Sequence, residues 1–266
     1  MTAPIRYGII GTGMMGVEHI DNIAALDGAV VTAIADTDAG SRASGIEACH
    51  DDVAVFEHHS DLVASDLCDA VVVVTPNMTH AAILADLLPT DLHILVEKPL
   101  CTTVDACRDV ARAAANRDAL LWVGLEYRYM PPVARLIERV EQGITGDVHM
   151  VSIREHRFPF LEKVGDWNRF NRNTGGTLVE KCCHFFDLMN LLVDRTPVQV
   201  YASGAQSLNH LDERYDGETP DILDNAFVIV DFEDGARALL DLCMFAEATH
   251  NQSEISASEP GARSRH

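Results

Sequence analysis

Apolar runs of strand length alternate with helical segments through the first 124 residues, and this alternation constrains the fold more than any other feature. Continuous apolar strands that alternate with helices indicate a parallel sheet covered on both faces. We therefore expect a doubly wound α/β domain over residues 1–124. The expected strands are Ile5–Ile10, Val30–Ala35, Val53–Phe56, Ala70–Val74, Leu92–Val96 and Leu120–Val123, and the expected helices are Met14–Leu26, Ala39–Cys49, Thr79–Leu87 and Val104–Asn116.

The pattern changes after Gly124, where strands begin to follow one another directly. Consecutive strands joined by tight turns pair antiparallel, so we expect a second, α+β domain over residues 125–266. Pro131 and Pro132 mark the start of its first helix, since proline is tolerated in a first helical turn. The expected helices are Val133–Glu141 and Thr177–Val193, and the expected strands are Val148–Arg154, Val198–Gly204, Ala226–Phe232 and Ala236–Phe245.

The C-terminal residues depart from this pattern. A strand begins near Ser253–Ile255, but the residues after Ile255 offer no large apolar side chain to a core. One interpretation is a frayed tail. The other is a truncated or frame-shifted terminus, which would leave the second sheet incomplete.

The formal net charge of −21 limits the possible partners. Binding to phosphate groups requires clustered lysine and arginine, so we expect neither nucleic acid nor an anionic membrane as a partner. The apolar runs are too short to span a bilayer, and the first residues lack the basic segment and cleavage site of a signal peptide. Together with seven cysteines in no metal-site spacing, these features predict a cytoplasmic protein with reduced thiols.

A glycine-rich turn joins the first expected strand to the first expected helix. In such a G-x-G-x-x-G turn, the first glycine permits the tight turn and the second lets the backbone approach a pyrophosphate, while the third lets the helix pack close to the sheet. The helix N-terminus then presents free N–H groups to the phosphates. The residues of this predicted dinucleotide site are Gly11, Thr12, Gly13, Met14, Met15 and Gly16.

Asp36 follows the second expected strand, twenty residues beyond Gly16, and Thr37 comes next as a further expected cofactor contact. A carboxylate at this place accepts hydrogen bonds from an adenosine ribose and repels the 2′-phosphate of NADP, so NAD is the favoured cofactor. Arg42 keeps NADP as the less favoured alternative, because a nearby arginine can accommodate that phosphate.

Three further motifs follow the glycine turn in a fixed order. They are Thr75-Pro76-Asn77 with His80, then Glu97-Lys98-Pro99, then Gly175-Gly176 leading to Glu180, His184 and Asp187. Together with the glycine turn, these motifs resemble the glucose–fructose oxidoreductase / inositol dehydrogenase / rhizopine-catabolism family over essentially the whole chain. The resemblance implies a Rossmann domain, then a domain with an open, mostly antiparallel sheet, and an active site between them.

The resemblance also implies roles for individual residues. Lys98 is expected beside the nicotinamide and the substrate hydroxyl, and His184 is expected to act as general acid and base. Glu180 stands where most members of the family carry aspartate. The residues expected to line the cofactor are Thr75, Pro76, Asn77, His80, Glu97 and Lys98.

Lys98 and His184 also suit the oxidation of an alcohol on physical grounds. A histidine with a pKa near ~6.5 can take a hydroxyl proton around neutral pH, and an ammonium group can stabilise the developing alkoxide. Glu180 and His184 are four residues apart, so both would project from one face of a continuous helix. Asp187 is expected to support them.

A metal site is the alternative for the same residues. It would combine Glu180 and His184 with either His149 or His156. Because the sequence shows no clear third ligand, we favour proton transfer and expect no bound metal.

A basic, aromatic segment over Arg154–Arg172 is expected to contact the substrate. It carries a charge of +2, from five basic and three acidic residues, in a chain of −21. Arg157 can grip hydroxyls or a carboxylate, and Trp167 can stack on a sugar face. A contact between domains or subunits is the alternative for this segment. By resemblance, Glu126, Arg128 and Asn168 are further expected substrate contacts, beside Glu180 and His184.

These observations predict an NAD-dependent oxidoreductase that oxidises a secondary hydroxyl of a polyol, an inositol or a sugar-like substrate. Two alternatives stay open. One is an NAD-assisted glycoside hydrolase or a sugar oxidoreductase with a tightly bound cofactor, and the other is a non-catalytic protein that binds NAD or a sugar. The open sheet of the second domain favours a homodimer or homotetramer.

Overall fold

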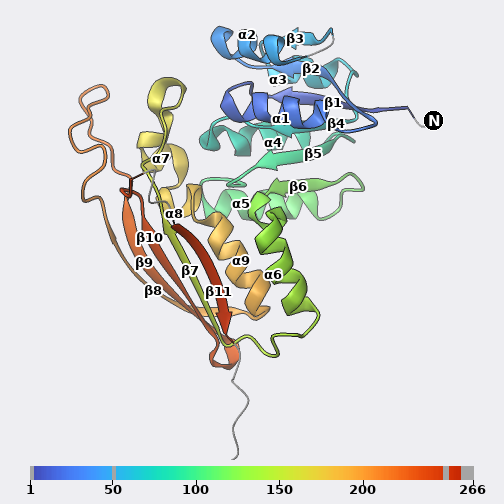
Figure 1. Cartoon of the computed structure of the whole chain (residues 1–266). Coiled ribbons are helices and arrows are strands. Elements are labelled where there is room, and N and C mark those ends of the chain that lie inside the picture. The colour runs from blue at the N-terminus through green and yellow to red at the C-terminus, as the bar shows by residue number, and fades with distance from the viewer. Residues whose placement is uncertain (1–2, 50–51, 248–251, 259–266) are drawn as a thin grey trace, which may run out of the picture. The chain divides into compact units, whose positions relative to one another are not determined.

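The computed structural model describes residues 3–49, 52–247 and 252–258 (Figure 1). These residues fall into two compact units. The first runs up to Gly124 and takes in Arg172–Gly175, and the second comprises Leu125–Asn171 and the residues from Gly176 onward.

The first unit is built on a parallel sheet in the order β3-β2-β1-β4-β5-β6. After β1 the chain adds β2 and β3 on one side of it, and then crosses over to add β4, β5 and β6 on the other side. The strand order therefore reverses between β1 and β4. This arrangement confirms the predicted doubly wound, Rossmann-type fold. The strands are β1 (Ile5–Ile10), β2 (Ala29–Ala35), β3 (Ala54–Phe56), β4 (Ala70–Val73), β5 (His93–Glu97) and β6 (Leu121–Gly124).

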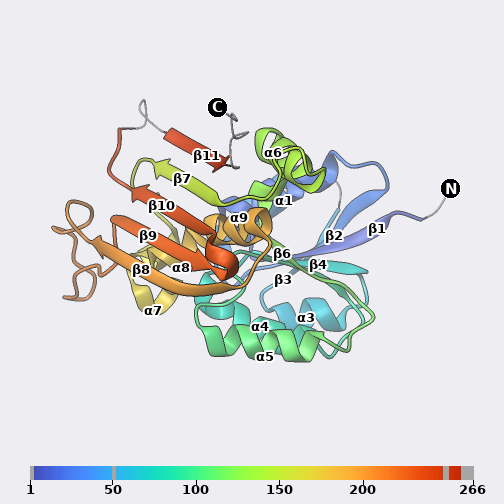
Figure 2. The same cartoon turned by 90° about the horizontal axis from the view of Figure 1, so that it is seen from below.

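Helices cover both faces of this sheet. On one face, Ile9 and Ile34 pack with Ile20 of α1, and on the other Leu84 of α4 and Val110 of α5 pack against the strands. Figure 2 shows α3, α4 and α5 together on one side of the sheet. The helical segments are α1 (Met14–Ala24), α2 (Ala39–Ala48), α3 (His59–Ala64), the 3-10 turn η1 (Asn77–Thr79), α4 (His80–Leu87) and α5 (Val104–Ala114).

The structure differs from the expectation for this unit at two places. The sequence reading missed α3, because its six residues span too few turns to show a helical period. The helix expected from Thr79 begins instead at His80, after the 3-10 turn η1 that follows Pro76.

The second unit is built on a mixed sheet in the order β11-β7-β10-β9-β8. The pair of β7 and β10 is parallel and the other pairs are antiparallel, which confirms the predicted α+β class with a mostly antiparallel sheet. The strands are β7 (Met150–His156), β8 (Pro197–Ala205), β9 (Asn225–Phe232), β10 (Arg237–Cys243) and β11 (Gln252–Ser258).

One face of this sheet carries the core of the unit. Phe185 and Leu188 of α9 pack there with Ile153 and Leu240, and α6 adds partly buried apolar residues (Figure 1). Phe227, on the opposite face, is largely exposed. Within the described part of this unit no helix covers that face. The helical segments are η2 (Glu126–Tyr129), α6 (Pro131–Glu141), η3 (Val164–Arg169), α8 (Thr177–Glu180), α9 (Cys183–Val193) and η4 (Glu233–Gly235). The short helix α7 (Asn171–Thr174) begins in this unit at Asn171, and its other residues belong to the first unit.

The single helix expected over Thr177–Val193 is in fact two helices, α8 and α9. The break lies at Lys181 and Cys182, where the N–H of Cys182 reaches back to the carbonyl of Thr177. The Lys181 side chain is buried against Glu155 and Tyr127. Glu180 and His184 therefore do not share one face of a continuous helix, which corrects that expectation.

The strand expected near Ser253–Ile255 is β11, which pairs antiparallel with β7. The tail was expected to begin after Ile255, but β11 continues to Ser258. The rest of the expected tail, residues 259–266, lies outside the described residues. Among the residues that the structure describes, no helix has the length and apolar character needed to cross a membrane.

Candidate active site

The glycine turn brings β1 and α1 together in the first unit. Gly11 has a φ of +98°, and a Cβ there would lie 2.7 Å from the carbonyl oxygen of Val74. A Cβ on Gly16 would collide with the carbonyl oxygen of Gly11, whereas a Cβ on Gly13 would meet nothing within 4 Å. Two glycines thus serve close packing, while Gly13 leaves open space at the start of α1, where the helix N-terminus favours an anion. This geometry fits a dinucleotide phosphate.

The Asp36 carboxylate is held at the carboxyl end of β2. The backbone N–H of Thr12 donates to its Oδ2 at 2.7 Å, and that of Asp38 donates to its Oδ1 at 2.9 Å. The Arg42 guanidinium donates to the Asp36 carbonyl at 2.6 Å. Two predicted cofactor residues, Asp36 and Thr12, are thus in direct contact. Thr37 and Met14 lie exposed beside them, and Met15 is partly buried.

The His80 side chain connects two other predicted cofactor segments, the one at Thr75 and the one at Pro99. Its ring is fully buried, with Nδ1 2.9 Å from the Pro99 carbonyl oxygen and Nε2 2.9 Å from that of Thr75. Burial lowers the pKa of His80, although the two carbonyl contacts oppose this. Asn77 is also buried, and its side-chain nitrogen has no hydrogen-bond partner among the described residues. A cofactor carbonyl is the kind of group that this nitrogen would take.

Glu97 lies buried between α1 and the Lys98 backbone. Its Oε1 is 2.8 Å from Nε2 of His19, and its Oε2 accepts a hydrogen bond of 3.0 Å from the Lys98 N–H. Burial opposes ionisation, but the hydrogen bond and charge of His19, with Lys98, hold the Glu97 pKa below its usual value. The sequence reading missed His19, which stands three residues after Gly16 in α1.

His184 lies in α9 of the second unit, where only 2% of its surface is exposed. Its ring stacks on Tyr127, with centroids 4.3 Å apart and planes inclined by 11°. Its Nε2 lies 3.6 Å from Oε1 of Glu126, whose side chain is half exposed. The structure thus brings the predicted residues Glu126 and His184 together. Sequence reasoning missed Tyr127 and had no local signal for it, because 57 residues separate it from His184.

Arg128 and Asp187 form a two-pronged ion pair. Arg128 Nε lies 2.6 Å from Oδ2 of Asp187, and its Nη2 contacts the other carboxylate oxygen. The Asp187 carboxylate, which was expected to support the acid–base residues, connects η2 to α9 through Arg128. The neighbouring Asp187 hydrogen bond raises the pKa of Arg128 further.

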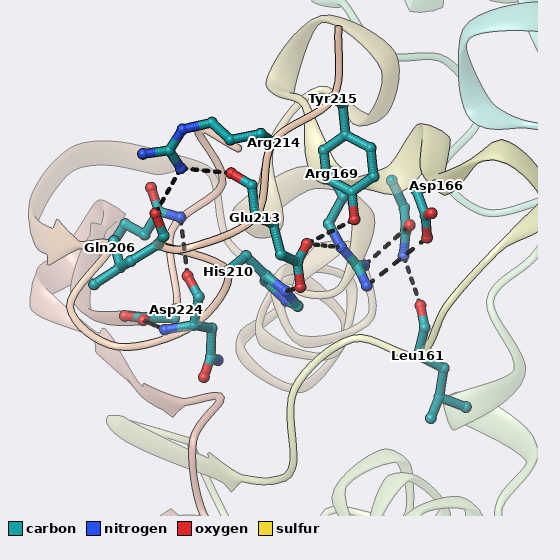
Figure 3. Close-up of polar contacts among 12 residues, drawn as sticks. Leu161, Asp166, Arg169, Gln206, His210, Glu213, Arg214, Tyr215 and Asp224 are labelled. Carbon is teal, nitrogen blue, oxygen red and sulfur yellow. Dashed lines mark hydrogen bonds and ion pairs between the residues drawn. The ribbon is translucent and has the colours of Figure 1, made fainter. Parts of the chain in front are cut away.

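The segment around Trp167 is anchored within the second unit. Asn168 is fully buried, and its side-chain nitrogen donates to the Leu161 carbonyl at 3.0 Å. Arg169, also buried, donates to Glu213 at 2.9 Å (Figure 3). Trp167 is partly buried. Of the predicted substrate contacts here, Asn168 therefore has its side chain turned into the loop.

Glu213 is the centre of this anchor. His210 Nδ1 lies 2.7 Å from its Oε1, and the Tyr215 hydroxyl donates to its Oε2 at 2.7 Å (Figure 3). Burial works against ionisation, yet these contacts and Arg169 lower the pKa of Glu213 to about 2. Arg157, another predicted substrate contact, has its guanidinium 4.8 Å from the Phe158 ring centroid.

The metal alternative receives no support from this geometry. His156 Nε2 lies 2.9 Å from Oδ1 of Asp241, so the ring is engaged on β10. No cluster of three His, Cys, Asp or Glu side chains suited to a metal occurs in the part of the chain that the structure describes.

Two family models match this chain, one in each unit. A family model described as "Oxidoreductase family, NAD-binding Rossmann fold" matches residues 5–125, and one described as "Oxidoreductase family, C-terminal alpha/beta domain" matches residues 137–259. An uncharacterized oxidoreductase of Bacillus subtilis, YrbE, is 29% identical over 91% of this chain and 67% of its own length. An inositol 2-dehydrogenase of Rubrobacter xylanophilus is 38% identical over 53% of this chain and 41% of its own.

A solved structure shows the same fold. GenD2 from gentamicin A biosynthesis, in complex with NAD, superposes with a TM-score of 0.85 at 24% identity. The match covers 97% of this chain and 70% of that one.

Proposed function

Because the chain belongs to the glucose–fructose oxidoreductase / inositol dehydrogenase / rhizopine-catabolism family of oxidoreductases, we propose that it oxidises a secondary hydroxyl of a polyol, an inositol or a sugar-like substrate with NAD. The observation that carries this proposal is the buried imidazole of His184, held between the Tyr127 ring and the Glu126 carboxylate. A histidine fixed in this way is suited to move a proton at one defined place.

In this proposal residues 1–124 bind NAD and residues 125–266 hold the substrate. Gly13 leaves room for the pyrophosphate at the N-terminus of α1, and Asp36 accepts the ribose hydroxyls. NADP is less suited, because the Asp36 carboxylate repels its extra phosphate and the Arg42 guanidinium is engaged by the Asp36 carbonyl. Asn77 offers its side-chain nitrogen to the cofactor. The remaining proposed cofactor contacts are Gly11, Thr12, Met14, Met15, Gly16, Thr37, Thr75, Pro76, His80, Glu97 and Lys98.

The proposed chemistry needs two groups of the protein at one hydroxyl. His184 accepts the hydroxyl proton, and Lys98 stabilises the negative charge that develops on the same oxygen as the carbon–hydrogen bond breaks. When bound, NAD supplies the hydride acceptor. The Glu97 carboxylate helps to fix the backbone at Lys98, because it accepts a hydrogen bond from the Lys98 N–H. The products are a ketone, NADH and one proton.

The substrate side of the proposal rests on polar groups of the second unit. Glu126 places a half-exposed carboxylate near His184, which suits a neighbouring substrate hydroxyl. Arg157 and Trp167 remain proposed contacts, and Arg128, Asn168 and Glu180 are proposed to shape the site. The partial match to an inositol 2-dehydrogenase supports a ring polyol as the substrate class.

A substrate screen tests this function. We expect NADH to appear with NAD and at least one member of a panel of inositols, sugar alcohols and sugars, and to be lost in Lys98→Met. Cofactor that stays bound through purification without net NADH release would favour the glycoside hydrolase or tightly bound oxidoreductase. Thermal stabilisation by NAD or a sugar without turnover would favour the binding protein. A cytoplasmic location and a homodimeric or homotetrameric state remain further proposals, which fractionation and light scattering test.

A further inference from the structure

Lys181 places a buried ammonium group close to the proposed acid–base residue. It lies in the break between α8 and α9 and is 7% exposed, while its partner Glu155 is 4% exposed. Its Nζ lies 3.2 Å from Oε1 of Glu155 and donates a hydrogen bond to the Tyr127 hydroxyl. Burial lowers the pKa of Lys181, and the charge of Glu155 opposes this shift. The ammonium thus has two oxygen partners inside the unit.

Tyr127 connects this ammonium to His184. Its ring stacks on the imidazole at 4.3 Å and meets the Phe185 ring edge-on, with centroids 5.6 Å apart. Rotation of the His184 imidazole about its Cβ–Cγ bond would push the edge of the imidazole into the Tyr127 ring. The stacked contact therefore restricts that rotation. The hydroxyl bond to Lys181 restricts the phenol in turn.

The stability of the unit does not by itself account for these buried charges. Replacement of a buried ion pair by apolar residues of similar volume is often neutral or stabilising. Glu155 comes from β7, Tyr127 from η2, and Lys181 from the link between α8 and α9. Ser253 of β11 adds a hydrogen bond to Glu155. These contacts hold the three segments together beside the Tyr127 ring, which stacks on His184.

We infer that Tyr127 and Lys181 are positioning residues for His184. Tyr127 holds the plane of the imidazole, and Lys181 holds Tyr127 through its hydroxyl. The inference rests on the proposed role of His184, and it explains how Nε2 is kept in one direction, near Glu126. Because a misplacement of ~1 Å can cost about 100-fold in rate, the effect belongs in kcat.

Variants of Tyr127 and Lys181 test this arrangement in the full chain. We expect Tyr127→Leu to lower kcat at least ~10-fold with little change in KM, and Tyr127→Phe, which keeps the stacked ring, to retain most of the rate. Since Lys181 acts through the hydroxyl, we expect Lys181→Met to lower kcat by about as much as Tyr127→Phe and to add little when the two are combined. The matched control is Tyr201→Leu, which removes a half-exposed tyrosine of β8 and leaves kcat unchanged.

The NMR signals of the His184 ring give a readout that does not depend on turnover. In histidine-labelled protein, assigned by comparison with His184→Ala, we expect one sharp set of ring signals in wild type and shifted or broadened signals in Tyr127→Leu. If Lys181→Met does not fold, Glu155→Gln combined with Lys181→Met replaces it. That pair removes both charges and keeps an acceptor for Ser253.

The outcomes separate this inference from the proposed function. Unchanged kcat and unchanged His184 signals in Tyr127→Leu, while His184→Ala loses activity, would overturn the inference alone. Full activity in His184→Ala would overturn the proposed function, and the NMR comparison would still decide whether Tyr127 and Lys181 order the ring.

Discussion

The Nε2 atom of His19 lies 2.8 Å from Oε1 of Glu97, and this contact joins the helix that follows the glycine turn to the end of β5. Both ends of the contact are in the first unit, and Glu97 also receives the Lys98 N–H. One buried carboxylate therefore links the proposed pyrophosphate site to the proposed catalytic lysine.

Removal of the His19 ring should leave the Glu97 carboxylate buried without its strongest partner. We expect His19→Leu to lower the free energy of unfolding at pH 7 by about 1–3 kcal/mol in urea titrations. The native pKa of Glu97 is lowered, so its stabilisation is present above the unfolded-state pKa and is lost as pH falls through the native pKa. The difference between His19→Leu and wild type should therefore shrink in acid. As the control, His59→Leu removes a partner of the exposed Asp86 and should cost less than ~1 kcal/mol.

The glycines of the turn should respond differently to an added methyl group. Gly16→Ala forces a Cβ against the Gly11 carbonyl, so we expect it to destabilise the protein by about 1–3 kcal/mol. Gly13→Ala meets no atom within 4 Å, so its thermal midpoint should stay near that of wild type. Its affinity for NAD, measured by calorimetry, should nevertheless fall at least ~10-fold because the methyl takes the space of the phosphate. Tight NAD binding by Gly13→Ala would contradict the proposed pyrophosphate site.

The choice between NAD and NADP should depend on Asp36. Asp36→Asn keeps an acceptor for the Thr12 N–H and removes the negative charge. We expect the ratio of NAD to NADP affinity to fall about 10-fold, since the 2′-phosphate is no longer repelled. Asp27→Asn, which changes a carboxylate in the turn before β2, should leave the ratio unchanged. An unaltered ratio of NAD to NADP affinity in Asp36→Asn would contradict the proposed contact between Asp36 and the adenosine ribose.

Glu213 should make the second unit sensitive to acid. Its pKa of about 2 lies below the ordinary value for glutamate, so its stabilisation is present at neutral pH and is lost as pH falls toward 2. We expect Glu213→Gln to lower the thermal midpoint at pH 7, because the buried Arg169 guanidinium loses its nearer charged partner and keeps only Asp166, at 4.0 Å. The difference in thermal midpoint between Glu213→Gln and wild type should become smaller in acid. Glu233→Gln, in the exposed turn η4, serves as the control, and equal midpoints for both variants at pH 7 would contradict the anchor.

The parallel sheet and the glycine turn were predictable because their signals are local. The strands of the first unit are largely apolar runs, and the turn places three glycines within six residues. The break between α8 and α9 was not predictable, because it lies where Lys181 meets Glu155, 26 residues away in sequence. A helical period in the sequence cannot register a side chain that is held by another strand.

The candidate site was predictable only in part for the same reason. His184 and Lys98 are residues that define motifs, whereas no motif singles out His19, Tyr127 or Lys181, whose roles depend on partners distant in sequence. Arg128 and Asn168 show the converse. Both were expected as substrate contacts by resemblance, Asn168 at a position where many relatives carry arginine, yet the structure engages their side chains with Asp187 and Leu161.

The pH dependence of NADH formation in wild type and His184→Ala tests the central claim most directly. Using an active polyol from the screen, we expect the wild-type kcat to fall as pH falls, because a protonated imidazole cannot accept the hydroxyl proton. We expect His184→Ala to lose at least ~100-fold in kcat and to lose that acid limb. A variant with the wild-type rate and the wild-type acid limb would contradict the assignment of proton transfer to His184.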